Sequence, residues 1–395
     1  MTILFYRYGS ICEPDIINTF RALNIDVVEE TAEVTDKNIS PAKCVELVSH
    51  SIETHHPIFV FSINFFPAVA EVCHIYNTLY LCWTVDSPVL ELFSQSICGP
   101  TNRIFLFDRA QYEYFNHYNP DCIYHLPLAS ASERFDQVIA SISNDDRQKY
   151  SSDISFVGSL YNEKNPLRSL SHLPDYISGY IDGIVDASLK VYGYNFIEEV
   201  LTDEIINNIK KADASFYAPA NAVTESDKYV TAHQYIGMQI AETERARTLN
   251  TLAEFFSVDL YTRSDSSALQ GVHVHDGIKT LTEMPKVFHL SKINLNMTIR
   301  PIQTGLPLRI FDILGCGGFL MTNYQPELTE HFEIGVDLEA YSSIEELVDK
   351  CQYYLTHEDE RKQIALNGYQ KVKASHTYQS RILEMVRVAS TLVDG

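Results

Sequence analysis

The stretch GLPLRIFDILGCGGF occupies residues 305–319 and reads as a turn that enters a helix and leaves it again. Gly305 and Pro307 predict a tight turn. Apolar side chains then recur at helical spacing at Leu308, Ile310, Phe311 and Leu314. A helix N-terminus presents unpaired backbone amides and partial positive charge, which suits a diphosphate group. The stretch therefore predicts an anion-binding turn in an α/β protein.

Two side chains of this predicted helix refine that interpretation. Arg309 lies on the first turn and offers several donors to a phosphate. Asp312 follows three residues later on the same face, where a carboxylate accepts both hydroxyls of a ribose. The alternative is that Arg309 and Asp312 pair with each other, and that Gly317 and Gly318 only allow the helix to pack closely on the next strand. Spacing alone leaves both interpretations open.

Outward from this stretch, short apolar runs alternate with amphipathic stretches along most of the chain. This alternation predicts parallel, doubly wound sheets. We expect two Rossmann-like domains that face a cleft. The strands are expected at residues 2–8, 26–30, 57–63, 79–85, 103–108 and 122–128 in the first domain, and at 154–158, 258–265, 292–298, 317–323 and 337–341 in the second.

The polar stretch 133–153 predicts a linker between these domains. We therefore expect an N-terminal domain over residues 1–150 and a C-terminal domain over 151–375. Residues 165–255 lack strand signals and predict a helical insertion. A C-terminal helix near 376–395 is expected to pack back on the first domain.

The composition of the chain limits the classes of molecule that it is expected to bind. The 395 residues contain 30 Lys and Arg against 52 Asp and Glu, a net charge of −22, which disfavours nucleic acid and anionic membranes. A small anionic ligand stays possible, because amides and one or two Arg dominate at short range. No run of apolar residues is long enough to span a membrane, no signal peptide is evident, and the eight Cys form no CxxC pair. These features predict a cytoplasmic protein, and the oligomeric state is left open.

Several segments resemble one known family in order along nearly the whole chain. GLPLRIFDILGCGGFLMTN resembles the donor-binding helix of GT-B glycosyltransferases, and more specifically of the spore-maturation CgeB/YkvP-like group. The other matching segments are WTVDSP (83–88), FLFDR (105–109), HLPLA (125–129), SFVGSLY (155–161), SKINLNMT (291–298), YYLTHEDERKQIALNGY (353–369) and HTYQSR (376–381).

The resemblance implies a metal-independent glycosyltransferase that needs no cofactor beyond its nucleotide-sugar donor. The donor, a UDP-sugar by frequency alone, binds the C-terminal domain, and a hydroxyl of a glycan, protein or surface acceptor binds the N-terminal one. Asp312 then takes the place of the ribose-binding acid, with Gly317 and Gly318 near the diphosphate. The remaining donor-side positions, within the region 294–323, are Asn296, Gly305, Leu306 and Pro307.

One departure matters. Many retaining GT-B enzymes carry two Glu eight positions apart, and here Thr304 stands eight residues before Asp312. The stereochemical outcome therefore stays open. So do two alternatives, a non-catalytic paralogue that binds nucleotide-sugar or serves a structural role, and a nucleotide-sugar epimerase on the same fold.

Further candidates follow strands of the second domain, since ligands of open parallel sheets bind beyond the carboxyl ends of the strands. Gly158 and Ser159 end one strand, where their amides are expected to close over a diphosphate; an ordinary strand-to-helix turn is the alternative. Arg263 follows VDLYT and is expected to reach the nucleotide, unless it is a solvated turn residue. His273 and His275 alternate, but we expect no metal site.

In the first domain, Asp86 comes directly after the strand LYLCWTV. It is expected to act as the general base for an acceptor hydroxyl if the enzyme inverts. The alternative is an N-cap, because Asp-Ser-Pro before an amphipathic run is good capping chemistry. Tyr8, Gly9 and Asn64 are expected on the acceptor side of the same cleft. His125 is a candidate contact for sugar or phosphate, or a core or hinge residue.

Overall fold

The computed structural model describes residues 1–170, 173–219 and 221–390, and the chain divides into two compact units. The first unit contains Met1–Ala129, residues 219–225 and residues 376–390. The second contains Ser130–Ala218 and Ser226–Ser375. Each unit is built around its own parallel sheet of six strands.

The sheet of the first unit has the order β2-β1-β3-β4-β5-β6, with every neighbouring pair parallel. Its central strands are buried on both faces, as their continuous apolar runs predict. The strands are β1 (Thr2–Tyr6), β2 (Asp26–Glu30), β3 (Phe59–Ile63), β4 (Leu79–Trp83), β5 (Asn102–Leu106) and β6 (Ile123–His125).

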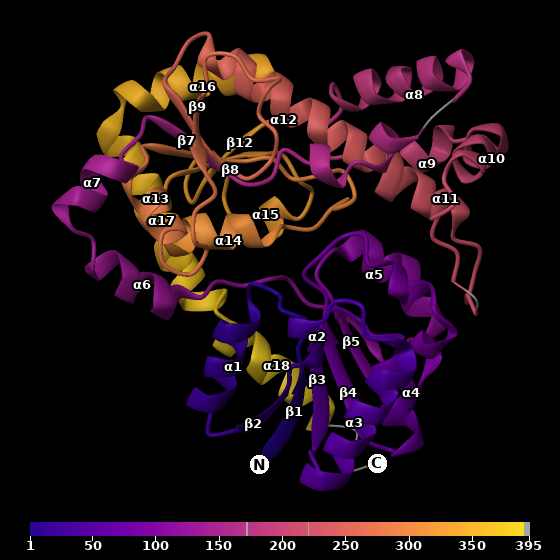
Figure 1. Ribbon diagram of the computed structural model, residues 1–395. Coiled ribbons are helices and arrows are strands. Elements are labelled where there is room, and N and C mark those ends of the chain that lie inside the picture. The colour runs from indigo at the N-terminus through magenta and orange to yellow at the C-terminus, as the bar shows by residue number, and fades with distance from the viewer. Residues whose placement is uncertain (171–172, 220, 391–395) are drawn as a thin grey trace. The chain divides into compact units, whose positions relative to one another are not determined.

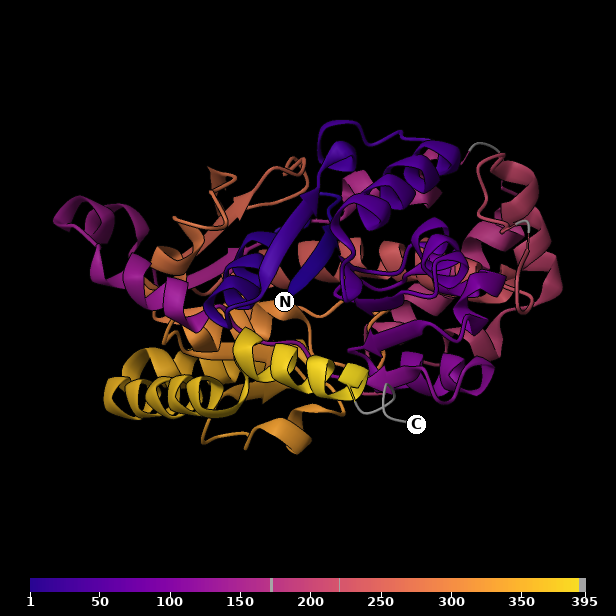
Figure 2. The ribbon, with the colours of Figure 1, turned by 90° about the horizontal axis from the view of Figure 1, so that it is seen from below.

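Helices cover both faces of this sheet (Figure 1). α1 (Glu13–Ala22) and α18 (Tyr378–Ser390) pack together on one face, and α3 (Pro41–His55) and α4 (Pro67–Ile75) pack together on the other. Figure 2 shows α18, in yellow, beside strands that lie at the other end of the sequence. Its Tyr378 ring meets the buried Trp83 of β4 edge-on, with 6.0 Å between ring centroids. The unit also contains the short α2 (Ala32–Thr35) and α5 (Arg109–Phe115).

A stretch from within the helical insertion also belongs to the first unit. The amide of Gln95 donates to the carbonyl of Asn221 at 2.8 Å, and the amide of Val223 donates to the carbonyl of Phe93 at 2.9 Å. The segment 221–223 thereby pairs, in antiparallel sense, with the chain at residues 93–95.

The sheet of the second unit has the order β12-β11-β10-β7-β8-β9, again all parallel. The strands are β7 (Ile154–Val157), β8 (Val258–Thr262), β9 (His273–Asp276), β10 (Ile293–Asn296), β11 (Leu320–Asn323) and β12 (Glu339–Tyr341). One face packs on α12 (Gly237–Ala253) and α16 (Ile344–Thr356) through a continuous apolar core. A second group of helices packs together as α13 (Met284–Leu290), α14 (Leu308–Gly315) and α17 (Glu358–Ser375), and α15 (Leu328–His331) follows β11.

The insertion between β7 and β8 is helical, as expected. It contains α8 (Asp175–Ser188), α9 (Ile197–Val200), α10 (Asp203–Ala212) and α11 (Asp227–Val230). A π-helical turn, Thr231–Ile236, then joins α11 to α12. Such turns are uncommon inside helices.

The linker expected at 133–153 is not a linker. It forms α6 (Ser132–Ala140) and α7 (Asn144–Tyr150), which belong to the second unit, so that unit begins at Ser130 rather than near 151. Ser143 and Asp146 make a capping box that starts α7. Lys286 of α13 then holds Asp146 at 2.9 Å, so the polar residues read as linker signals are caps and ion-pair partners.

Among the described residues, no helix is long and apolar enough to cross a membrane.

Candidate functional site

Three predicted residues meet at the carboxyl ends of β1, β3 and β4. Asn64 donates from Nδ2 to Oδ2 of Asp86 at 2.7 Å and to the hydroxyl of Tyr8 at 2.9 Å. The Tyr8 hydroxyl donates to the same Asp86 oxygen at 3.3 Å. Asp86 itself is exposed. The cluster therefore presents a carboxylate that reaches solvent while two donors fix its orientation.

The backbone around Asn64 explains why the carboxylate is held. Asn64 is left-handed, with φ of 59°, a conformation that Asn tolerates better than most residues. Its Oδ1 accepts the amide of Val85 at 3.0 Å, and its own amide donates to the carbonyl of Trp83 at 2.9 Å. One side chain thus binds both the backbone before Asp86 and its carboxylate.

The N-cap alternative for Asp86 is not found. No α-helix begins after Ser87-Pro88; the next element is a 3-10 helix, Leu90–Phe93, whose N-cap is Val89.

The backbone of the turn after β1 is hydrogen-bonded by a buried carboxylate. Glu13 is fully buried and pairs with Arg7 at 2.9 Å. Its Oε1 accepts the amides of Tyr8 and Gly9, each at 2.9 Å, and Gly9 has φ of 91°, which favours glycine. Burial, together with the charge of Asp86, raises the pKa of Tyr8 well above its ordinary value. Tyr8 is therefore a neutral hydroxyl donor at physiological pH.

In the second unit, a buried arginine that sequence reasoning missed lies against the turn after β7. Arg245, on α12, is 8% exposed. It donates to the carbonyl of Ser159, and its Nη2 donates to the carbonyl of Met297 at 2.8 Å. Its guanidinium lies over the ring of Tyr161, 4.4 Å from the centroid. In the described part of the chain, no carboxylate forms an ion pair with Arg245.

Arg309, on the first turn of α14, is the second arginine here. It packs over Phe288, 5.1 Å from the ring centroid, and its Nη1 lies 3.4 Å from Oδ2 of Asp312. Burial lowers the pKa of both arginines, and the Arg309 charge lowers that of Arg245 further. Both stay protonated at neutral pH, because the ordinary pKa of arginine is about 12.5 or higher. The two guanidinium groups repel each other, and this favours binding of an anion between them even in a chain of net charge −22.

A helical pattern could have identified Arg245 from the sequence. Ala241, Leu249 and Leu252 lie four residues before, four after and seven after it, and all are buried on one face of α12. An arginine in the middle of such an apolar stripe requires a partner.

Several polar groups of the turn after β7 are already hydrogen-bonded within the second unit. Gly158 donates its amide to the carbonyl of Tyr261 at 3.1 Å. The Ser159 hydroxyl donates to Glu163 at 2.5 Å and accepts the amide of Tyr161 at 2.8 Å. Ser159 is thus brought beside Arg245 through its carbonyl.

The loop that leads into α14 is clamped by residues following β11. Gln325 donates to the carbonyls of Ile302 and Gly305 at 3.1 and 3.4 Å. Thr304, where the two-Glu pattern has an acid, donates to the buried Glu327 at 2.7 Å. Leu306 is buried and Pro307 is the N-cap residue of α14.

The side chain of Asn296 makes its hydrogen bonds within the second unit. It is buried and donates to the hydroxyls of Thr298 and Thr322 at 3.0 and 2.9 Å. It therefore ties the end of β10 to β11.

Gly317 and Gly318 lie at the opposite end of α14 from Arg309. They precede β11, whereas Arg309 begins the helix that follows β10. A Cβ on Gly318 would come within 2.6 Å of the Phe288 carbonyl oxygen, so this glycine permits close packing. The structure does not bring these glycines together with the arginines.

Two other predicted site residues, Arg263 and His125, lie outside the clusters described above. Arg263 is exposed, and its side chain packs against Gly277. His125 ends β6 and lines a pocket of the first unit.

The two alternating histidines pair with one carboxylate. His275 and His273 approach Asp259 at 2.7 and 3.9 Å, and the described residues contain no group of three ligands suited to a metal ion.

Comparison with known proteins adds to this geometry. Residues 245–387 match a family model described as "Glycosyl transferase-like". That range begins at Arg245 and includes Arg309. No curated protein sequence matches the chain.

Solved structures resemble the whole chain. The crystal structure of HepE from Anabaena in complex with UDP-glucose has a TM-score of 0.53 at 10% identity, over 99% of this chain and 100% of that one. Sucrose-phosphate synthase from Thermosynechococcus elongatus gives 0.57 at 10% identity, over 100% and 99%. A glycosyltransferase from Rickettsia africae gives 0.53 at 10% identity, over 100% and 99%. The predicted fold class, GT-B with two Rossmann-like parallel-sheet units, is confirmed.

Proposed function

We propose that this protein is a glycosyltransferase that moves a sugar from a nucleotide-diphosphate sugar, a UDP-sugar in the first instance, to a hydroxyl group of a glycan or protein acceptor. The observation that carries the proposal is the buried Arg245 beside the turn after β7, together with Arg309 at the start of α14, whose charge acts on Arg245. The family match over 245–387 and the UDP-glucose complex of the HepE structure support it. Membership of the CgeB/YkvP-like group and the cytoplasmic location stay part of the proposal.

Cleavage of the bond between sugar and diphosphate leaves negative charge on the β-phosphate. A site accelerates this step when fixed positive groups await that charge. Arg245 and Arg309 are pre-placed, because packing on Tyr161 and Phe288 limits their movement. Two arginines of this kind supply the neutralisation that a divalent metal supplies elsewhere, so we propose a metal-independent reaction without a further cofactor.

The acceptor hydroxyl must lose its proton as the new bond forms. Asp86 is the proposed general base on the first unit, because it is exposed and held by Asn64 and Tyr8. A base of this kind contributes roughly a hundredfold to ten-thousandfold in rate. This role implies inversion at the anomeric carbon.

A panel of UDP, GDP, TDP and CMP, each with attached sugars, tests the donor by thermal shift. A ligand present at a hundred times its Kd stabilises the folded state by about 2.7 kcal/mol. The proposal requires a shift with at least one nucleotide-sugar, and transfer of its sugar to an acceptor hydroxyl, with release of the nucleotide, that continues when EDTA is present. Absence of any shift contradicts the donor site. Conversion of the donor to its epimer, or binding without turnover over a panel of acceptors, contradicts the transfer reaction.

A further inference from the structure

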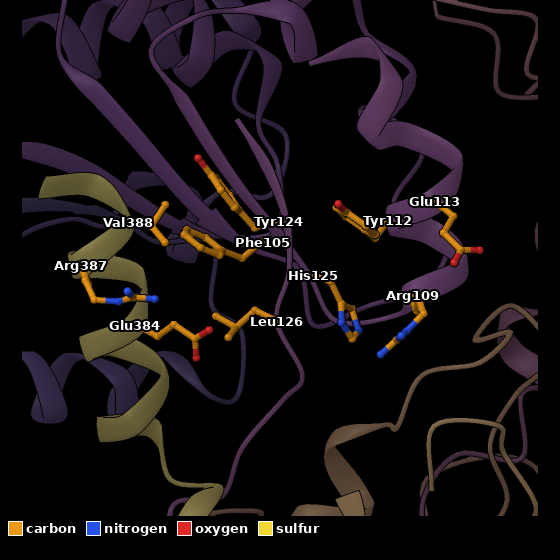
Figure 3. Close-up of a pocket in the computed structure, with 10 residues that line it drawn as sticks. All are labelled: Phe105, Arg109, Tyr112, Glu113, Tyr124, His125, Leu126, Glu384, Arg387 and Val388. Carbon is orange, nitrogen blue, oxygen red and sulfur yellow. The ribbon is translucent and has the colours of Figure 1, made fainter. Parts of the chain in front are cut away.

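A pocket of about 460 Å³ opens at the outer edge of the first unit's sheet, around the end of β6 (Figure 3). Ligand sites in proteins commonly have volumes of roughly 300–1,000 Å³. One side is formed by α5 and the other by α18, with β5 and β6 between them. All of its lining residues belong to the first unit.

Aromatic rings form much of the wall. Phe105 and Tyr124 stack with 5.3 Å between centroids, and the Tyr124 hydroxyl donates to the carbonyl of Asp121 at 2.5 Å. Tyr112 of α5 lies beside His125, with 6.2 Å between ring centroids. The ring of Tyr112 therefore offers a face to a ligand that sits over the end of β6.

Two positively and two negatively charged side chains flank these rings. Arg109 and Glu113 come from α5, and Glu384 and Arg387 come from α18. Figure 3 shows Arg109 beside His125 on one side and Arg387 with Glu384 on the other. The two arginines and two glutamates cancel, so the pocket has hydrogen-bond donors and acceptors on both sides without net charge.

This chemistry suits a sugar ring. A saccharide has an apolar C–H face that packs on an aromatic ring, and each hydroxyl both donates and accepts. A phosphate would gain from Arg109 and Arg387 but would be repelled by the carboxylates of Glu113 and Glu384. A neutral polyol satisfies both kinds of group.

One helix connects this pocket to the Asp86 cluster. Gln111 of α5 donates to the hydroxyl of Ser87, the residue after Asp86, at 3.3 Å. The next residue along, Tyr112, lines the pocket. Both places lie at the carboxyl edge of the same parallel sheet.

We infer that this pocket is a saccharide-binding site that holds a sugar unit of an extended acceptor, away from the hydroxyl that reacts at Asp86. The part concerning the acceptor rests on the proposed function, whereas saccharide binding by the pocket does not.

The first experiment presents the full-length protein, without nucleotide, to a microarray of neutral and acidic oligosaccharides. Affinity for the strongest ligand found is then measured by calorimetry for the parent and for Tyr112→Ala and Arg387→Ala. Tyr76→Ala is the matched control, because its exposed side chain bonds Glu53 on the surface outside the pocket. We expect about a tenfold or greater loss in each pocket variant and no change in the control.

The outcomes separate this inference from the proposed function. Absence of any oligosaccharide ligand, or equal affinity in the parent and both pocket variants, overturns the site. A thermal melt of each variant within about 3 °C of the parent shows that the fold is intact. If transfer is never detected while the pocket variants still lose saccharide affinity, the site stands and the proposed transfer fails.

If transfer is detected, a second comparison applies. Tyr112→Ala should raise KM for the extended acceptor with kcat unchanged, and leave KM for a monosaccharide acceptor as it is. An equal rise in both KM values overturns the extended-acceptor role.

Discussion

The side-chain amide of Asn64 binds the carboxylate of Asp86 at 2.7 Å and, through its carbonyl oxygen, the backbone amide of Val85 at 3.0 Å. One residue at the end of β3 therefore sets both the path of the chain after β4 and the direction of the carboxylate. The first two predictions concern these two residues.

Asp86→Asn should leave nucleotide-sugar affinity unchanged and lower the transfer rate by roughly a hundredfold to ten-thousandfold, because the amide cannot accept the acceptor's proton. Initial rates at saturating donor measure this loss. Asp26→Asn is the control, since Asp26 is exposed at the start of β2, the other end of the same sheet. A rate within a few-fold of the parent would reduce Asp86 to a structural role.

Asn64→Gly should be about 1 kcal/mol more stable than Asn64→Ala, because glycine adopts the left-handed backbone without cost. Both variants should lose transfer, since neither holds Asp86. The matched pair is Asn77→Gly and Asn77→Ala, at φ of 49° in the turn before β4. That pair should show the same stability order by urea unfolding and full transfer activity. Equal activity losses at both positions would contradict an orienting role for the Asn64 amide.

Arg245→Gln should weaken UDP binding by about tenfold to a hundredfold, as expected for a charge-assisted hydrogen bond, and leave uridine binding unchanged. Calorimetry with both ligands measures the difference. Arg247→Gln is a close control: it lies two residues later on α12, is exposed, and pairs with Asp186 at 2.9 Å. Similar losses for UDP and uridine would mean that Arg245 supports the fold of the site rather than the phosphates.

Asp312→Ala distinguishes ribose binding from simple pairing with Arg309, 3.4 Å away. If Asp312 accepts the ribose hydroxyls, the parent should bind UDP about tenfold to a hundredfold more tightly than 2′,3′-dideoxy-UDP, and the variant should bind both alike. A discrimination that survives in the variant assigns Asp312 to the pairing with Arg309.

Gly318→Ala should destabilise the protein by about 1–3 kcal/mol, because its Cβ would lie 2.6 Å from the Phe288 carbonyl oxygen. UDP affinity should be unchanged if the glycine serves packing alone. Gly179→Ala in α8 is the control, since its Cβ would meet nothing within 4 Å; it should stabilise by about 0.5–1 kcal/mol. A selective fall in UDP affinity for Gly318→Ala would restore the diphosphate role.

Much of the fold could be predicted because its strands are unambiguous. A continuous apolar run such as FVFSI predicts a parallel strand that is buried on both faces. β9 was missed because HVHD is a polar strand at the edge of the sheet, paired with β8 alone among the described residues. Residues 133–153 were misread because capping and ion-pairing use the same polar residues as a linker, and the partner Lys286 is distant in sequence.

The candidate site could be predicted only in part. Tyr8, Asn64 and Asp86 were identified together because parallel topology places strand ends on one edge. Arg245 was not identified; the apolar stripe of α12 marks it as a buried arginine, but its contact on the turn after β7 is distant in sequence. Gly317 and Gly318 were placed near the diphosphate by resemblance alone; the structure shows the close packing of Gly318 on Phe288, and the diphosphate role stays a prediction.

The packing of α18 on the sheet of the first unit has a consequence for biosynthesis. That unit takes its strands from the first part of the chain and its last helix from residues beyond 376, including the Tyr378 ring against Trp83. Roughly 250 residues must be translated between the two, which takes on the order of 12–50 s. Throughout that interval the emerging sheet lacks the helix that covers Trp83. The first unit therefore waits for its last helix while the second unit is made, and chaperones have this apolar face available during that interval.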